Sequence, residues 1–563
     1  MAIINGSDLG ETLLGTDDAD TINAKGGHDL VIGKKGDDIA LLGTGNDIFR
    51  WFPGDGSDTV DGEAGTDTLD FVGAGADENI QIFANAGKAI FFRDIAAVTM
   101  TLDNVERIQF EALGGSDLIT LNNLAGTDVK HVAVDLAGVL NGTAGDGVQD
   151  NVIVNGAAAG AADVIALWQT GTGAAATVVV NGLAAQTTIA HFDAGDHLVV
   201  NGLGGNDRLD ASLLPQSMVL VLDGGAGDDT LIGSAGADLL LGGAGNDIVV
   251  GARGDDTAFL GAGDDTFFWA PGEGSDTVEG GPGTDTLAFL GAGAAETVDI
   301  LANFGRTTFF RDIASINMDL NDVERIEFDA LGGADKVRVH DLTGTEVNRV
   351  DIDLAGTVGG TTGDGAVDAV TVEGTAGANG ITLWNSGSTV GINGLQEQVS
   401  IQHLDAYDQL TVDGGAGNDV INASAVGAGR VSLTLSGGAG DDTLVGSAGS
   451  DVLIGGAGAD RFVFPSLSYS AVGPKADKIA DFSHAQGDKI DVSPIDANVW
   501  AAGNQAFHFI GSGLFTHTAG ELRFAYTSPT TTTVAGDVNG DGTSDFHIVL
   551  AGNVALTAAD FVL

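Results

Sequence analysis

The stretch that decides the fold is a nine-residue unit near the middle of the chain, Gly242-Gly243-Ala244-Gly245-Asn246-Asp247-Ile248-Val249-Val250. Its last three residues predict a short β-strand whose middle side chain, Val249, points inward. The six residues before it predict a tight turn, because glycine adopts the positive φ angles that such turns need. Two units then complete one coil, so that alternate units stack about 4.8 Å apart. The unit therefore predicts a parallel β-roll.

The same unit recurs along the chain, and its Asp marks each copy. Successive Asp residues are nine positions apart, except for two steps of eleven that end at Asp58 and Asp276. The inward apolar position recurs with them, from Ile22 in the first group to Phe462 in the last. The Asp positions are Asp20, Asp29, Asp38, Asp47, Asp58 and Asp67; then Asp229, Asp238, Asp247, Asp256, Asp265, Asp276 and Asp285; then Asp419; then Asp442, Asp451 and Asp460.

Stacking of the coils predicts rows of carboxylates. The expected neighbours are Asp20 with Asp38, Asp29 with Asp47, and Asp238 with Asp256. Stacked carboxylates repel strongly at low dielectric. A Ca²⁺ ion takes about 6–8 oxygen ligands, which turn carbonyls and Asp carboxylates can supply. Asp also caps isolated turns, but capping does not require Asp at the same place in successive turns. We therefore expect all of these Asp residues to bind Ca²⁺.

The repeated pattern G-G-x-G-x-D-x-U-x, with U apolar, resembles the calcium-binding nonapeptide of the RTX, or haemolysin-type, proteins. A lone copy would be a weak signal, whereas near-consecutive copies at fixed spacing are specific. The resemblance implies a β-roll that binds several Ca²⁺ ions. It also implies a chain that stays unfolded in the low-calcium cytoplasm and folds outside the cell.

The second group of repeats duplicates the first at an offset of 218 residues, and the similarity continues beyond the nonapeptides. Phe91–Ala96 recurs at Phe309–Ala314, and further on the offset shrinks to 212. The regions between the groups are rich in short β-branched runs separated by Gly and Asn, which indicates an irregular β-solenoid, with a sandwich as the alternative. We expect an all-β chain of two duplicated lobes, followed by a C-terminal β-roll with a capping domain. The expected segments are rolls at 1–70, 223–288 and 436–463, solenoid lobes at 71–222 and 289–435, and a C-terminal domain at 464–563.

The composition limits the partners. Lys and Arg number 22 against 79 Asp and Glu, so the net charge is −57. Nucleic acids and anionic membrane surfaces require a basic face, so neither is expected as a partner. Because 43% of the residues are apolar, the chain can still bury a core. An acidic chain with a core suggests that cations neutralise its charge in the folded state. Cysteine is absent, which excludes disulfides and thiol catalysis.

The last hundred residues differ in composition from the repeats, with more Lys and aromatic residues. The motifs Ala476–Phe482, Gly487–Asp491 and Gly540–Phe546 resemble the C-terminal domain that caps the β-roll of serralysin-type metalloproteases. That resemblance implies type I secretion with an uncleaved C-terminal signal, for which Asp560–Leu563 has the expected form. The N-terminal residues lack a classical signal peptide, which agrees with this route. The stretch Asp537–Gly542 also opens like an EF-hand loop but lacks its final Glu, so a hairpin turn is expected.

Catalytic motifs are missing from the sequence. It contains no H-E-x-x-H, no G-x-S-x-G and no Walker A motif. His191 and His403 recur at matching positions, each followed by two Asp residues, and a turn or core role is expected over a metal or acid–base role. Arg93 and Arg311, each beside an Asp, are expected to form ion pairs at a solenoid edge, with substrate binding as the alternative.

The repeats and the missing catalytic motifs therefore predict a calcium-binding repeat protein that is not an enzyme, and the RTX and serralysin resemblances imply secretion from a Gram-negative bacterium. Its expected role is structural or adhesive, at the cell surface or in the extracellular matrix. Its expected partners are Ca²⁺ and a type I exporter, with a surface glycan or a second copy of the chain as candidates. The alternative is a polysaccharide-acting enzyme, a lyase or epimerase, on a β-helix. A groove lined by acidic, basic and aromatic side chains would favour that alternative.

Overall fold

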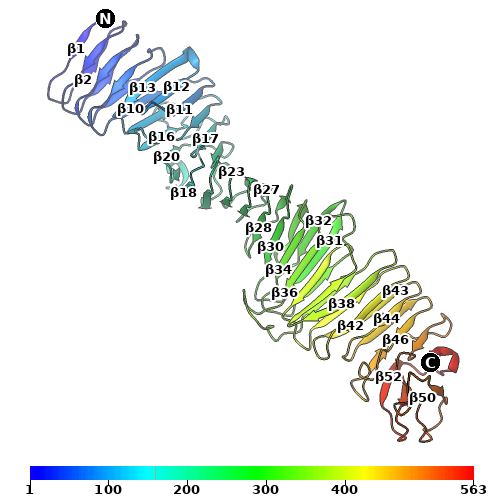
Figure 1. The fold of residues 1–563 in the computed structure, drawn as a ribbon. Coiled ribbons are helices and arrows are strands. Elements are labelled where there is room, and N and C mark those ends of the chain that lie inside the picture. Colours follow the sequence, from blue (N-terminus) through cyan, green and yellow to red (C-terminus); the bar gives the residue numbers. More distant parts are fainter. Residues whose placement is uncertain (159) are drawn as a thin grey trace. The chain divides into compact units, whose positions relative to one another are not determined.

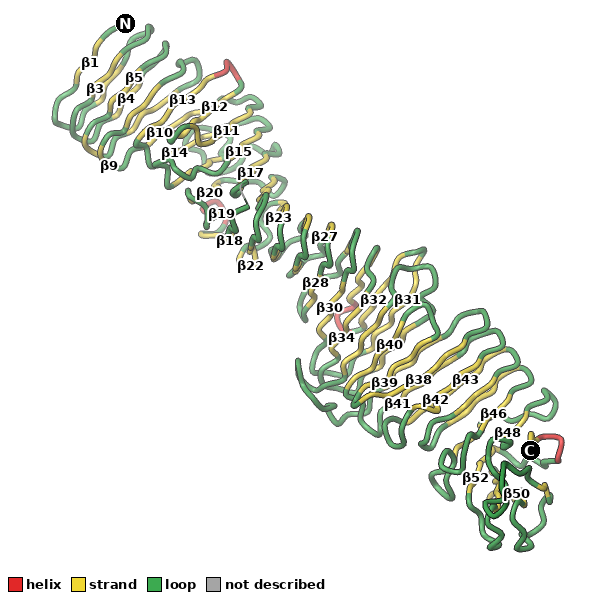
Figure 2. The backbone as a smooth tube through the Cα atoms, in the orientation of Figure 1, coloured by secondary structure: helices red, strands yellow, loops and turns green. Residues whose placement is uncertain are grey.

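The computed structural model describes residues 1–158 and 160–563. These residues form two compact units, Met1–Asp285 and Thr286–Leu563. In each unit the chain winds as a solenoid whose short strands alternate between two sheets (Figures 1 and 2). The predicted β-solenoid is thus confirmed, and it continues through the regions between the repeat groups. No helix in the described part of the chain is both long and apolar enough to span a membrane.

The first sheet of unit 1 contains, in spatial order, β1 (Ile3–Asn5), β3 (Thr21–Asn23), β5 (Ile39–Leu41), β8 (Thr59–Asp61), β13 (Val98–Asp103), β12 (Lys88–Arg93), β11 (Asn79–Asn85), β15 (Leu118–Leu121), β17 (Asn151–Asn155), β21 (His197–Asn201), β23 (Val219–Ala226), β25 (Leu239–Ala244), β27 (Thr257–Ala262) and β29 (Thr277–Glu279). The second sheet contains β2 (Thr12–Leu14), β4 (Leu30–Ile32), β7 (Ile48–Trp51), β10 (Thr68–Val72), β14 (Arg107–Glu111), β16 (His131–Asp135), β20 (Gln186–Ala190), β19 (Thr177–Asn181), β18 (Val164–Thr170), β22 (Arg208–Leu213), β24 (Thr230–Ile232), β26 (Ile248–Val250) and β28 (Thr266–Trp269). A small separate pair joins β6 (Thr44–Gly45) and β9 (Ala64–Gly65).

Unit 2 is built on the same plan. Its first sheet contains β33 (Ile316–Asn321), β32 (Arg306–Arg311), β31 (Thr297–Asn303), β35 (Lys336–Val339), β37 (Ala369–Glu373), β41 (Gln409–Asp413), β43 (Ser432–Ala439), β45 (Val452–Ala457), β47 (Asp477–Ile479), β52 (Phe546–Ala551), β51 (Thr531–Asp537), β50 (Glu521–Ser528) and β49 (His508–Phe509). Its second sheet contains β30 (Thr286–Leu290), β34 (Arg325–Asp329), β36 (Arg349–Asp353), β40 (Gln398–Gln402), β39 (Thr389–Asn393), β38 (Gly380–Ser386), β42 (Val420–Ala425), β44 (Thr443–Val445), β46 (Arg461–Val463), β48 (Lys489–Asp491) and β53 (Phe561–Val562). Short 3₁₀ helices lie at η1 (Ile95–Ala97), η2 (Gly173–Ala175), η3 (Ile313–Ser315) and η4 (Ala558–Asp560).

Two zigzags distinguish the lobes from a simple roll. In unit 1, β12 runs antiparallel to its neighbours β11 and β13 within the first sheet, and β19 runs antiparallel to β18 and β20 within the second. Each zigzag adds two extra strands to one sheet only. Because the first zigzag lies in the first sheet and the second in the second sheet, both sheets gain the same number of strands. Unit 2 repeats both zigzags, with β31–β33 and β38–β40. The duplication seen in the sequence therefore extends to the topology.

The core is the row of inward side chains between the two sheets. In the nonapeptide strands the middle residue is buried and its neighbours are not, as in β3 and β24. This confirms the inward apolar position predicted from the repeat. Where unit 1 leaves its first repeats, aromatic rings widen the core, and Trp51 stacks on Phe71 with ring centroids 4.1 Å apart. Phe91 then packs on Phe71 at 4.2 Å.

The C-terminal segment closes the end of unit 2. Strand β52 lies parallel to β47 and continues the first sheet, and β51 and β50 extend it as an antiparallel meander. The last residues form β53, which lies parallel to β48 in the second sheet. The segment expected to carry the secretion signal is thus part of the folded cap, with Phe561 buried.

Candidate metal centre

The Asp residues of the repeats form continuous ladders, one rung per coil. In each rung the backbone N–H of one Asp donates a hydrogen bond to Oδ1 of the Asp one coil later. This bond is 2.6 Å from Asp20 to Asp38, 2.7 Å from Asp29 to Asp47 and 2.8 Å from Asp238 to Asp256. The stacking predicted from the nine-residue spacing is therefore confirmed for these three pairs.

The other carboxylate oxygen, Oδ2, is the unusual feature of the ladders. In most rungs it is buried and has no hydrogen-bond partner among the residues that the structure describes. Buried polar atoms are nearly always paired, so an unpaired carboxylate oxygen requires an explanation, such as an ion. The predicted site residues with such an oxygen are Asp29, Asp38, Asp47, Asp58, Asp67, Asp229, Asp247, Asp256, Asp265, Asp276, Asp419, Asp442 and Asp460.

Glycine makes room for this oxygen. In many units the first residue is a Gly that lies beside the Oδ2 of the unit's own Asp, whereas the units of Asp29, Asp47 and Asp265 have Ala or Leu there. A Cβ at Gly251 would stand 2.5 Å from Oδ2 of Asp256, and one at Gly455 would stand 2.3 Å from that of Asp460. Real Cβ atoms do not approach so closely, so the glycine keeps open the space beside the carboxylate. The motif thus combines an unpaired anionic oxygen with open space beside it that a side chain would otherwise fill.

Three predicted residues differ from this pattern. Asp20, Asp238 and Asp451 are buried in the same ladders, but the Thr or Ser four positions earlier donates hydrogen bonds to them through its N–H and hydroxyl groups. Asp285 follows the rung pattern, since its Oδ1 accepts the N–H of Asp265 at 2.9 Å. The carboxylates of Asp20, Asp238 and Asp451 are therefore already satisfied by the protein.

The electrostatics of the ladders favour a cation. Burial, reinforced by the neighbouring carboxylates, raises the pKa of Asp58 and of Asp67 to about 7 and that of Asp256 to about 8. Asp20, at the start of its ladder, is the exception, because the N–H groups of Ala2 and Thr16 lower its pKa. A row of carboxylates that resists ionisation becomes stable in the charged form when a divalent cation lies beside it.

The residues present fit Ca²⁺. The chemistry of the turns is all oxygen, the carboxylate oxygens are unpaired and buried, and glycine leaves the space beside them open. Such hard oxygen ligands are those that calcium prefers. Within residues 1–158 and 160–563, no three His, Asp or Glu side chains form a metal-binding group by themselves. When bound, the ion would supply the positive charge that the stacked carboxylates lack.

The ladders extend well beyond the repeats, which the sequence analysis did not predict. The same N–H to Oδ1 bond links Glu78 to Asp117, Asp117 to Asp150, and Asp150 to Asp196. In unit 2 it links Glu296, Asp335, Asp368 and Asp408 in the same order. Further rungs lie at Asp163, Asp207, Asp477 and Asp488. The irregular spacing concealed these residues, although a Gly two positions before Asp117, Asp207 and Asp335 was an available signal.

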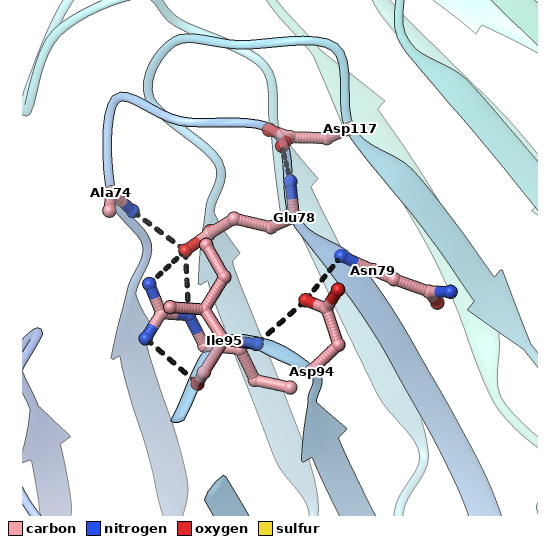
Figure 3. Close-up of polar contacts among 7 residues, drawn as sticks. Ala74, Glu78, Asn79, Asp94, Ile95 and Asp117 are labelled. Atoms are coloured by element: carbon pink, nitrogen blue, oxygen red, sulfur yellow. Dashed lines mark hydrogen bonds and ion pairs between the residues drawn. The ribbon is translucent and has the colours of Figure 1, made fainter. Parts of the chain in front are cut away.

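One rung in each unit carries a built-in counter-ion. The guanidinium of Arg93 forms a buried ion pair with Glu78, and its Nε donates to Oε1 at 2.6 Å (Figure 3). Arg311 pairs with Glu296 in the same way. The expected ion pairs at a solenoid edge are therefore found, but they are buried and join the ladder Glu. The adjacent Asp94 instead accepts the N–H groups of Asn79 and Ile95.

Each of the two recurring histidines bonds an Asp of the adjacent strand rather than one of the Asp residues that follow it in sequence. His191 bonds Asp135 through Nδ1 at 2.6 Å, and His403 bonds Asp353 at the same distance. Both histidines adopt a positive φ, 56° and 57°. Each pair joins a His that directly follows one strand, β20 or β40, to the last residue of the strand beside it, β16 or β36, which agrees with the expected turn role of the histidines.

The EF-hand-like stretch forms the loop between the antiparallel strands β51 and β52. Asp537 accepts the N–H groups of Gly540 and Gly542, and Asp541 accepts that of Thr543. The expected hairpin turn is thus confirmed.

The fold and its ladders define a calcium-binding β-solenoid, and comparison with known families agrees. The family profile described as "RTX calcium-binding nonapeptide repeat (4 copies)" matches residues 6–49, 54–77, 221–249, 241–268 and 272–288. The profile "Peptidase M10 serralysin C terminal" matches residues 360–563, and so begins well before the segment expected from sequence. The chain therefore carries RTX calcium-binding repeats and a serralysin-type C-terminal segment.

Individual proteins add little to this picture. No curated protein matches the chain. Among solved structures, the solution structure of the AlgE6R3 subunit of the Azotobacter vinelandii mannuronan C5-epimerase is 27% identical over 34% of this chain and 77% of that one, with a TM-score of 0.19.

Proposed function

We propose that the chain is a secreted protein whose solenoid folds outside the cell when its Asp ladders bind calcium, and that it serves as a structural or adhesive component of the cell surface or extracellular matrix. The observation that carries the calcium proposal is the column of buried, unpaired carboxylate oxygens at the turns. The RTX and serralysin-type matches support a secreted calcium-binding protein.

The physical reason is that the ladders are unfavourable without a cation. The chain carries a net charge of −57 and places its aspartates in rows with an N–H to Oδ1 bond at each rung. Ordering each residue costs roughly 1–2 kcal/mol of backbone entropy, whereas one inward Val or Leu returns only about 1.5–3 kcal/mol per nonapeptide. Calcium binding then becomes folding energy. A chain of this kind remains unfolded at low calcium, which suits passage through a type I exporter.

Circular dichroism during a calcium titration of the full chain tests this mechanism. We expect a cooperative gain of β-signal, reversed by a chelator. Magnesium serves as the control, because it demands a smaller octahedral site and keeps its waters. A chelated protein with full β-signal and an unchanged melting temperature would refute calcium-driven folding.

The structural or adhesive role follows from the repetition of one plan in both units, with the ladders rather than a single cleft as the common feature. A surface glycan and a second copy of the chain are the candidate partners. Cells lacking the protein should attach less well to surfaces or form less biofilm, and adding calcium-loaded protein should restore attachment and biofilm mass. Normal biofilm and attachment in such cells would contradict the role.

A polysaccharide-acting enzyme remains the second candidate, and one cluster favours it. His340 bonds Glu373 through Nδ1 at 2.9 Å and Asp299 through Nε2 at 3.1 Å, beside Arg338. The matching positions of unit 1 include Asn122 and Asn155, which are uncharged. Calcium-loaded protein should then cleave or epimerise an acidic polysaccharide, and His340→Ala should abolish that activity. Absence of product from a panel of uronate polymers would remove this candidate.

A further inference from the structure

A second type of ladder site lies between the RTX blocks of unit 1 and is repeated in unit 2. Asp117 is 1% exposed, and its Oδ2 has no hydrogen-bond partner in the described chain. Its Oδ1 accepts the N–H of Glu78, and its own N–H donates to Asp150. Asp117 therefore has the same pairing as an RTX rung, with the same unsatisfied oxygen. No RTX match covers it, since the matches end at residue 77 and resume at 221.

The backbone of this turn copies that of an RTX turn. At Asp256 the residues four and two positions earlier, Ala252 and Gly254, have φ of 67° and 126°. At Asp117 the corresponding residues are Leu113 and Gly115, with φ of 68° and 125°. A Leu in the left-handed region is uncommon and costs of order 1–3 kcal/mol. The turn thus keeps the RTX conformation, in which Lys25 and Lys34 likewise have a positive φ four residues before Asp29 and Asp38.

A further carboxylate approaches from the next coil. Oδ2 of Asp146 accepts the N–H of Gly115 at 2.9 Å, two residues before Asp117. Oδ1 of Asp150 accepts the N–H of Asp117 at 2.8 Å. Three carboxylates from two successive coils therefore surround this turn. The neighbouring rung differs, because Arg93 neutralises Glu78 there.

Unit 2 repeats every element of the arrangement. Asp335 is 2% exposed with an unpaired Oδ2, and its N–H donates to Asp368 at 2.9 Å. Asp364 accepts the N–H of Gly333 at 2.7 Å, and Leu331 has φ of 66°. The same unsatisfied oxygen in two copies, each in a turn of RTX conformation, points to a retained ligand.

We propose that Asp117, Asp146 and Asp150 in unit 1, and Asp335, Asp364 and Asp368 in unit 2, each bind one divalent cation of calcium chemistry outside the RTX motif. The side chains alone do not form a complete metal-binding group, so backbone carbonyls of the turn supply the remaining oxygens, as calcium sites commonly require. A buried Ala112 stands where many RTX units have their first Gly, as the buried Ala24 does before Asp29. The proposal extends calcium binding beyond the repeats, and it can fail while the repeats bind calcium.

Crystals of the full chain grown in calcium and exchanged into terbium test the positions directly. Anomalous difference maps should show peaks in the RTX turns and also between Asp117 and Asp150 and between Asp335 and Asp368. Filled RTX turns with no peak at these two places would overturn the proposal but leave the proposed function intact. Empty RTX turns would instead overturn the proposed function.

Binding stoichiometry in solution gives an independent test. In equilibrium dialysis with calcium, the double variant Asp117→Asn, Asp335→Asn should bind one ion fewer per unit than the wild type. The control is Asp128→Asn, Glu346→Gln, which removes the same charge from two exposed, matching positions and should leave the stoichiometry unchanged. Equal calcium binding by both variants would contradict the proposal, and the terbium crystals decide the matter if the first variant does not fold.

Discussion

Replacing Asp256 by Asn should stabilise the calcium-free fold but weaken the further stabilisation that calcium gives. Burial, and then the charges of Asp276, Asp238 and Glu273, raise the pKa of this carboxyl to about 8 from 3.8. Each pKa unit corresponds to about 1.4 kcal/mol, so retaining this group in the calcium-free fold at pH 7.5 costs on the order of 5 kcal/mol. Asn removes that cost but leaves an unpaired amide N–H group where Oδ2 stood, which costs about 1–3 kcal/mol. We therefore expect a gain of about 2–4 kcal/mol without calcium.

In saturating calcium the same substitution removes an anionic ligand. A site at 100 times its Kd contributes about 2.7 kcal/mol, so the variant should lose about that much of the calcium-dependent stabilisation, which roughly cancels its gain over the wild type in chelator. Thermal melting followed by circular dichroism, in chelator and in calcium, measures the calcium-dependent rise in Tm. It should shrink clearly in Asp256→Asn. The control Asp255→Asn removes the same charge from an exposed neighbour that accepts the N–H of Ser275, and it should keep the wild-type rise.

One result would refute this reasoning. If Asp256→Asn lowered Tm equally in chelator and in calcium, the carboxylate would act only as a hydrogen-bond acceptor for the turn. The N–H of Asp238, which donates to Asp256 at 2.8 Å, would then account for its role.

Three further predictions concern pH, the buried ion pair and the C-terminus. Asp38, Asp58 and Asp256 have pKa values raised to about 6, 7 and 8 in the calcium-free fold, so the stability that their protonation contributes is fully present below about pH 4 and is lost as the pH rises to about 8. Chelated protein should show more β-signal at pH 5.5 than at pH 8, and the reverse order would contradict the assigned shifts. Arg93→Met should destabilise unit 1 by about 3–5 kcal/mol in calcium, because it leaves Glu78 charged and buried. In urea unfolding, adding Glu78→Gln should recover most of that loss, and no recovery would mean that Arg93 acts through packing. Deleting Asp560–Leu563 should reduce secretion, and wild-type secretion by the truncated chain would place the signal upstream. Because Phe561 is buried and pairs with Ile490, the deletion should also lower the Tm of the cap, while the calcium-induced β-signal remains.

The sequence by itself determined the roll, its ladders and their ion. A period of nine with Gly at the turn and one apolar residue per strand has few solutions other than stacked coils, because each short strand can bury only its middle residue. Asp29 and Asp47 were therefore placed side by side from spacing alone. The offset between Phe91 and Phe309 likewise revealed the duplication. These are local and periodic features, and such features survive in a single sequence.

The tertiary structure decided everything that depends on which coils become neighbours. The zigzags reverse the chain within a sheet, so Glu78 and Asp117 become adjacent although 39 residues separate them. Sequence spacing cannot reveal such a contact once the repeat length varies. The partner of Arg93 is Glu78 rather than Asp94 for the same reason. The structure also separated aspartates with an unpaired oxygen, such as Asp256, from those already satisfied by a Ser, such as Asp238. That distinction rests on where individual hydrogen-bond donors lie in space, which no repeat pattern encodes.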